Sequence, residues 1–199
     1  YRRQRQMSIR DSLIYDDNYI PFLLQYCKKN DIKAIISLFD IDLYVLASHK
    51  KEFSDNGITV IVSDTDVISV CNDKWNTYNF LKGNGFNAPL TYISKEDFFI
   101  AYKNGMISFP VIVKPRWGMG SIGVYIADNK EELDVFYAKV KRDIASSYLK
   151  YESTQDTEKS VLIQQMIDGQ EYGLDVINDL KGNYKNTICL LYTSDAADD

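Results

Sequence analysis

Three closely spaced glycines and one lysine are the residues of this 199-residue chain whose chemistry is easiest to read. Gly118, Gly120 and Gly123 follow G-x-G-x-x-G spacing inside KPRWGMGSIGVYIAD, a stretch that begins with Lys114. Residues without side chains let backbone N–H groups close around phosphate oxygens, and a lysine ammonium adds a compact positive charge. The pattern therefore indicates a site for a phosphorylated ligand.

The segment after the glycines distinguishes two kinds of phosphate site. A dinucleotide-binding fingerprint needs a strand before the glycines and a helix after them, because the helix N-terminus holds the pyrophosphate. Here GVYIAD follows and alternates like a strand. Strand, glycine loop and strand predict a hairpin flap over a nucleotide triphosphate, as in protein kinases. An ordinary loose hairpin with a snorkelling lysine at the strand end is the structural alternative.

The N-terminal part has the pattern of a β-α-β unit. After Asn18, interpreted as a helix cap, apolar residues recur at helical spacing over 19–29. A buried strand is expected at 33–38, a helix at 42–53 and a second strand at 58–62. This order predicts a parallel sheet.

The middle of the chain contains a break and then a second set of elements. Helices are expected at 67–70 and 74–81, and the domain boundary lies between about 64 and 90, where glycines and Pro89 interrupt the pattern. Ser94 and Asn129 each precede an amphipathic helix. Strands are expected in FPVIVKP, VYIAD, VLIQQMI, EYGLDVIND and NYKNTICLL, and the last two form a hairpin.

The stretch VLIQQMIDGQEYGLDV supplies the groups that a nucleoside needs. An apolar strand runs into IDG and then Glu171. Such a strand can offer backbone C=O and N–H to an adenine edge, and the carboxylate can accept hydrogen bonds from ribose hydroxyls. A plain sheet edge would have the same sequence.

Taken in order, these motifs resemble the ATP-grasp superfamily. They are NDK-x5-FL followed by glycine and proline from residue 72, then PVIVKP with the glycine loop, then the strand that ends in G-x-E. The resemblance covers about 13–190 and is closest to the ATP-binding half-modules of the carbamoyl phosphate synthase large subunit.

The resemblance implies an α/β (α+β) fold with two domains. A pre-ATP-grasp parallel α/β domain would occupy 13–70, and an ATP-grasp domain would occupy 71–190, truncated at its C-terminus. The glycine-flap lid subdomain would span about 108–167, and the C-terminal subdomain would begin at about 168.

The resemblance also implies roles for particular positions. Lys74 and Lys114 would contact the phosphates, Gln164 would lie near the adenine amino group, and Glu171 would bind the ribose. The flap would comprise Trp117, Gly118, Met119, Gly120, Ser121, Ile122 and Gly123. The hinge at the adenine edge would comprise Gln164, Gln165, Met166 and Ile167. No catalytic side chain is assigned.

The implied activity is that of an ATP-dependent ligase, which phosphorylates a carboxylate so that an amine or similar nucleophile can attack the acyl phosphate. ATP and Mg²⁺ are the implied cofactors, with the magnesium ligands expected beyond the C-terminal end of this chain. A nucleotide-binding regulatory or interaction module without ligation is the alternative. A Rossmann oxidoreductase ranks third, because a strand follows the glycines.

Other candidate residues have ordinary structural interpretations. Asp175 has the strand parity of Glu171 and could serve a metal, but solvent exposure is the favoured interpretation. Asp40 and Asp42 follow the first strand, where they could face a substrate or cap a helix. His49 is expected at the surface.

Composition excludes several classes of protein. A net charge of -5 and a pI near 5.0 argue against a nucleic-acid partner. Three scattered cysteines and one histidine suit neither a disulfide framework nor a zinc site. No apolar run is long enough for a membrane span and no signal peptide is recognised, which favours the cytoplasm. A homo-oligomer is compatible with the sequence.

The two ends differ from the middle. The arginine-rich start and the end LLYTSDAADD resemble translated sequencing-adapter sequence. Residues 1–12 and 191–199 are therefore expected to be non-native tails, and ordinary polar tails are the alternative.

Overall fold

The computed structural model describes residues 14, 16–118, 120–147, 149 and 156–191. The chain divides into two compact units, Tyr1–Gln165 and Met166–Asp199. Each unit has its own secondary structure and is described by itself.

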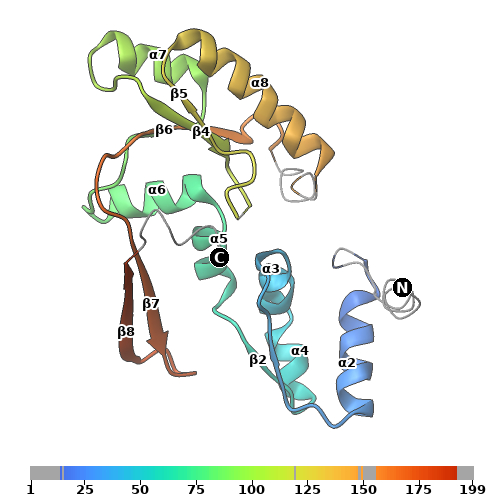
Figure 1. The fold of residues 1–199 in the computed structure, drawn as a ribbon. Helices are drawn as coiled ribbons and strands as arrows, with labels where there is room; N and C mark the ends of the chain where they lie inside the picture. The colour runs from blue at the N-terminus through green and yellow to red at the C-terminus, as the bar shows by residue number, and fades with distance from the viewer. Residues whose placement is uncertain (1–13, 15, 119, 148, 150–155, 192–199) are drawn as a thin grey trace. The chain divides into compact units, whose positions relative to one another are not determined.

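The N-terminal part of the first unit is the predicted α/β arrangement. Strands β1 (Ala34–Ile36) and β2 (Thr59–Ile61) pair in parallel, as Figure 1 shows. Three helices belong to the same part of the chain: α2 (Tyr19–Lys29) precedes β1, and α3 (Asp40–Ser48) and α4 (Lys50–Asp55) lie between β1 and β2 in the sequence. The core consists of buried residues from these elements and their connections: Ile20, Leu24, Cys27, Leu46, Phe53, Ile58 and Val60.

Two details differ from the sequence interpretation. Asn18 precedes α2 but does not cap it, because its backbone N–H and its amide both donate to the Asp16 carboxylate. The single helix expected over 42–53 is divided at His49, whose ring Nδ1 lies 2.8 Å from the Val45 carbonyl. The His49 N–H bonds to Leu46 instead, which ends α3 with a tighter turn.

Two helices connect this part to the next sheet. Helix α5 spans Thr65–Cys71 and helix α6 spans Lys74–Gly83, close to the bounds expected for both. Asp73 is the N-cap of α6, and its carboxylate accepts from the N–H groups of Trp75 and Asn76. The cap sets Lys74 as the first helical residue.

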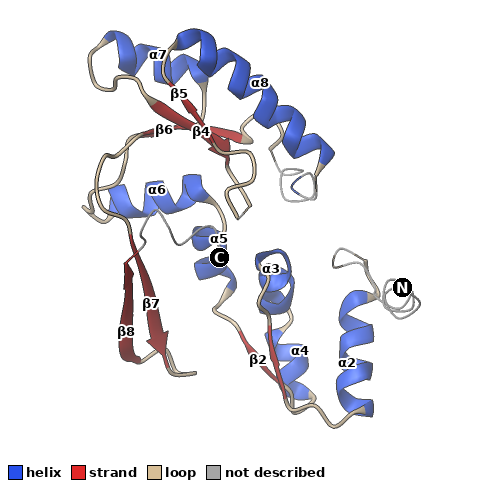
Figure 2. Ribbon diagram, viewed as in Figure 1, coloured by secondary structure: helices blue, strands red, loops and turns tan. Residues whose placement is uncertain are grey.

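A four-stranded antiparallel sheet follows, with the strand order β3-β6-β4-β5. Its central strands are β4 (Val111–Pro115) and β6 (Val161–Gln165), coloured red in Figure 2. The short strands β3 (Thr91–Tyr92) and β5 (Tyr125–Ala127) flank them. Strand β3 is not predicted from the sequence, because its two residues are too few to show alternation.

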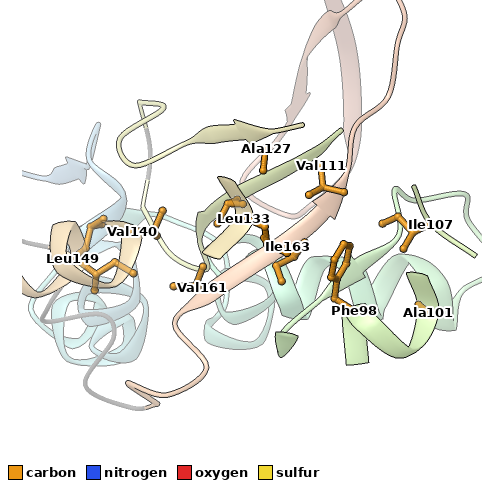
Figure 3. Close-up of a cluster of buried hydrophobic side chains, with 12 residues drawn as sticks. Phe98, Ala101, Ile107, Val111, Ala127, Leu133, Val140, Leu149, Val161 and Ile163 are labelled. Atoms are coloured by element: carbon orange, nitrogen blue, oxygen red, sulfur yellow. The ribbon is translucent and has the colours of Figure 1, made fainter. Parts of the chain in front are cut away.

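Helices α7 (Lys95–Lys103) and α8 (Lys130–Ser146) pack on one face of this sheet. Figure 3 shows part of the shared core, where side chains of the two helices meet those of β4 and β6. Along β4 the burial pattern alternates, so Val111 and Val113 are fully buried. Ile112 and Lys114 consequently point to the opposite face of the sheet.

The second unit contains the predicted β-hairpin. Strands β7 (Tyr172–Asn178) and β8 (Tyr184–Leu191) pair antiparallel through a turn in which Gly182 has a φ of +81°. The Asp179 carboxylate accepts hydrogen bonds from the N–H groups of Lys181 and Asn183. The side chains of both strands are largely exposed.

Candidate functional site

A buried ion pair joins the start of α6 to the end of β4. The Asp73 carboxylate, already the cap of α6, also pairs with Arg116 at 2.7 Å, and their side chains are only 8% and 13% exposed. The Arg116 guanidinium stacks on the Trp117 ring at 4.5 Å. Because Lys74 follows Asp73 and Lys114 precedes Arg116, this pair sets the relative position of two lysines from distant parts of the sequence.

Lys74 extends from α6 to the glycine flap. Its ammonium donates to the Gly118 carbonyl at 2.6 Å, and its backbone N–H donates to the Arg116 carbonyl at 3.2 Å. The α6 N-terminus is thus bonded to the first residues of the flap at two points. A positive charge lies beside the glycines, as the sequence predicts.

Lys114 lies on the sheet face opposite the helices. Its ammonium donates to the Gln164 Oε1 at 2.6 Å, between neighbouring strands β4 and β6. Burial lowers the pKa of Lys114 below its ordinary value, because desolvation disfavours the charged form. A bound anion would favour the charged form again.

The two glutamines of β6 point in different directions. Gln164 faces Lys114, and its amide nitrogen donates to the Thr91 hydroxyl at 2.8 Å. Gln165 lies against the β3 side, where its Oε1 accepts from the Leu90 N–H and its own N–H donates to the Leu90 carbonyl. The Gln165 N–H is therefore already paired within the protein.

The flap has a backbone that favours glycine. Gly118, Gly120 and Gly123 all have positive φ, and so does Ser121 at +57°. A Cβ on Gly118 would lie 2.4 Å from the Leu149 side chain. The φ of +97° favours glycine at position 118, and a Cβ there would also displace the Leu149 side chain.

Two hollows adjoin the lysines, and both Lys74 and Lys114 line each of them. The first has a volume of about 240 Å³ and lies under the flap; its other lining residues are Ile112, Pro115, Trp117, Gly118, Gly120, Ser121, Ile122 and Val124. The second has a volume of about 180 Å³; its other lining residues are Thr77, Tyr78, Leu81, Ala88, Pro89 and Gln164. Two ammonium groups beside an apolar strand face suit a ligand with a flat apolar part and a polyanionic tail.

The remaining predicted site residues lie elsewhere or outside the description. Met119 is outside the described residues. Three further predicted residues are exposed and lie just before β7, in the second unit: Met166, Ile167 and Glu171. The structure thus brings together Lys74, Lys114, the described flap residues and Gln164.

The other acidic candidates are engaged locally or exposed. Asp42 accepts hydrogen bonds from Ser37 and from the Tyr19 hydroxyl. Burial of Tyr19, together with the nearby negative charge of Asp42, raises the pKa of Tyr19 to about 12. Asp40 begins α3, but Phe39 occupies the N-cap position. Asp175 is exposed on β7. Among the described residues, no group of three His, Cys, Asp or Glu side chains could hold a metal ion.

Sequence reasoning assigns no role to Arg116 or Thr91. Arg116 follows Lys114 by two residues and is one of two arginines beyond position 10, which is the only signal that singles it out. Thr91 lies in the missed strand β3, and nothing local marks it. Both act through partners far away in the sequence.

Comparison with known proteins agrees with the fold. Residues 107–198 match the ATP-grasp domain family, and residues 9–61 match the PylC-like N-terminal domain family. The described parts of this chain thus have the mixed α/β fold of an ATP-grasp protein, with a parallel two-stranded sheet in the N-terminal part. Along the chain, the match to the PylC-like N-terminal domain comes first and the match to the ATP-grasp domain follows it. The ATP-grasp resemblance is therefore confirmed.

Individual relatives give the same result. D-alanine–D-alanine ligase from Thermotoga maritima is 31% identical over 126 residues, which are 63% of this chain and 35% of the ligase. L-amino acid ligase from Bacillus licheniformis aligns with a TM-score of 0.64 and 20% identity, covering 86% of this chain and 38% of that one. The biotin carboxylase domain of 2-oxoglutarate carboxylase from Hydrogenobacter thermophilus, crystallised with MgADP and bicarbonate, aligns with a TM-score of 0.62 and 21% identity, covering 87% and 37%.

The chain therefore spans little more than a third of the length of these relatives. No helix in the described part of the chain is long and apolar enough to cross a membrane.

Proposed function

We propose that this chain is the ATP-binding portion of an ATP-grasp ligase that activates a carboxylate as an acyl phosphate for attack by an amine or similar nucleophile. The observation that carries the proposal is that Lys74 and Lys114, 40 positions apart in the sequence, line the same two hollows, one of which lies beneath the glycine flap. Phosphoryl transfer depends mainly on alignment and charge neutralisation, which two lysines and a flap of backbone amides can supply.

Each part of the site has a separate task. The Lys74 and Lys114 ammonium groups neutralise phosphate charge, and the apolar face with Ile112 and Val124 receives the base. The flap covers the phosphates and excludes water. Glu171, in the second unit, is the proposed ribose ligand on the strength of the family resemblance. Mg²⁺ is the proposed metal cofactor and would enter with the nucleotide.

The substrates are proposed from the relatives. The names of two of them specify ligation of D-alanine and of L-amino acids. An amino-acid carboxylate and an amine are therefore the substrate class to test first, and a carbamoyl-phosphate-synthase-like substrate is the second. A nucleotide-binding module without ligation is the competing function.

Calorimetry of the chain with MgATP tests nucleotide binding. Lys114→Ala is expected to weaken binding by about 10- to 100-fold, which is the usual worth of a hydrogen bond to a charged group. Lys103→Ala, an exposed lysine on α7, is the matched control and should bind as the unaltered chain does. Unchanged affinity of Lys114→Ala would refute the site, and binding of NAD(H) in place of ATP would support an oxidoreductase.

The whole protein tests the reaction itself. ADP release that depends on both an amino acid and an amine acceptor would support a ligase. Tight MgATP binding without turnover on any carboxylate of the panel would support the binding module.

A further inference from the structure

A chain of three hydrogen bonds crosses the sheet behind the phosphate site. The Thr91 hydroxyl donates to the Pro89 carbonyl at 2.9 Å, and the Gln164 amide nitrogen donates to the same hydroxyl at 2.8 Å. The Lys114 ammonium then donates to the Gln164 Oε1 at 2.6 Å. These residues come from β3, β6 and β4, so the chain links three neighbouring strands.

The direction of every bond in this chain is fixed. A carbonyl can only accept and an ammonium can only donate. The Thr91 hydroxyl must therefore give its hydrogen to Pro89, which leaves its oxygen to accept from Gln164. The Gln164 amide is consequently oriented with its oxygen toward Lys114.

A glutamine at this position has a specific electrostatic consequence. Its neutral oxygen holds the ammonium at hydrogen-bond distance while leaving the positive charge uncompensated. A carboxylate at the same distance would form an ion pair with Lys114 and offset that charge. A glutamate could also donate no hydrogen to Thr91 when ionised, so the chain would be broken.

We propose that Thr91 and Gln164 are positioning residues that hold the Lys114 ammonium toward the ligand phosphates without neutralising it. This inference rests on the proposed nucleotide function. It differs from the sequence interpretation, in which Gln164 reads the adenine amino group. Thr91 is only 2% exposed and lines neither hollow, so it acts through Gln164 alone.

The first test needs no nucleotide. NMR of isotope-labelled lysine side chains in the ligand-free chain reports the pKa of Lys114. Thr91→Val should lower this pKa further, because Gln164 is no longer oriented to stabilise the charged form, and Gln164→Glu should raise it. Thr91→Ser keeps the hydroxyl, so the pKa of Lys114 should equal that in the unaltered chain. Thr59→Val changes an exposed threonine on β2 and should also leave the pKa of Lys114 unchanged.

The second test separates the phosphates from the base. Calorimetry with inorganic tripolyphosphate, ATP and adenosine is expected to show about tenfold weaker binding of the first two ligands to Gln164→Glu, as befits a charge introduced beside the ammonium. Thr91→Val should lower the affinity for the same two ligands several-fold. Adenosine affinity should not change in either variant.

The outcomes distinguish the two proposals. A Lys114 pKa that is the same in Thr91→Val and the unaltered chain would overturn the positioning role, even if ATP binds. So would a loss of adenosine affinity without a loss of tripolyphosphate affinity, because Gln164 would then read the base. If the unaltered chain binds neither ATP nor tripolyphosphate, the nucleotide function fails while the NMR result still stands on its own.

Discussion

Strands β6 and β7 are neighbours in the sequence, and predicted nucleotide-site residues lie on β6 and in the segment just before β7, yet the surroundings of the two strands differ. Val161, Leu162 and Ile163 of β6 are fully buried, and β6 lies between β3 and β4. Strand β7 pairs only with β8 among the described residues, and its side chains are exposed apart from the half-buried Gly173 position. Strand β6 is therefore held by packing and by strands on both sides, whereas β7 belongs to a two-stranded hairpin with exposed side chains.

The largest expected effect comes from the ion pair that joins α6 to β4. Arg116→Met should lower the free energy of unfolding of the first unit by about 3–5 kcal/mol, because it leaves the buried Asp73 carboxylate without its partner. Urea unfolding followed by circular dichroism and tryptophan fluorescence measures this. Lys51→Met, which removes an exposed ion pair with Asp55, is the control and should change little. Equal stability of the two variants would contradict the importance of the pair.

The next largest loss of stability is expected from truncating a buried side chain of β6. Ile163→Ala should lower the free energy of unfolding by about 2–5 kcal/mol, because Ile163 is fully buried in the core between the four-stranded sheet and helices α7 and α8. The denaturation midpoint of the first unit provides the measurement. A loss below that of an exposed substitution would show that β6 is not part of a packed core.

A smaller effect is expected in the flap, where two glycines form a matched pair. Gly118→Ala and Gly120→Ala both place a Cβ at positive φ, which costs about 1–2 kcal/mol. Only the Gly118 variant also meets the Leu149 side chain. Thermal unfolding should therefore rank Gly118→Ala as the less stable of the two. The reverse order would mean that Leu149 does not restrain the flap.

The smallest effect is expected in the hairpin. Leu174→Ala changes a side chain that is 61% exposed, so stability should change by no more than about 0.5 kcal/mol. Chemical denaturation under the conditions used for Ile163→Ala makes the comparison direct. A loss as large as that of Ile163→Ala would show that β7 is covered by another part of the whole protein.

Most of the elements could be predicted from the sequence, because their periodicity is local. The apolar run of FPVIVKP predicts the strand that carries Lys114, and the strand predicted after the glycines excludes a dinucleotide fingerprint. The exceptions have local causes as well: the His49 ring occupies the carbonyl that would have continued α3, and β3 is too short to show a pattern. The motif order sufficed to identify the ATP-grasp domain, which the family match confirms.

The roles of individual polar groups depended on the tertiary structure. The family resemblance implies an adenine contact for Gln164, and only the fold shows that its amide is paired with Lys114 and Thr91. Asp73 and Arg116 are 43 residues apart, and Thr91 and Gln164 are 73 apart. Neighbouring residues encode which face of a strand a side chain occupies, but a hydrogen-bond partner is chosen by strand order and register. For this protein the sequence determined where the charges and glycines lie along the chain, and the fold decided which groups hold them in place.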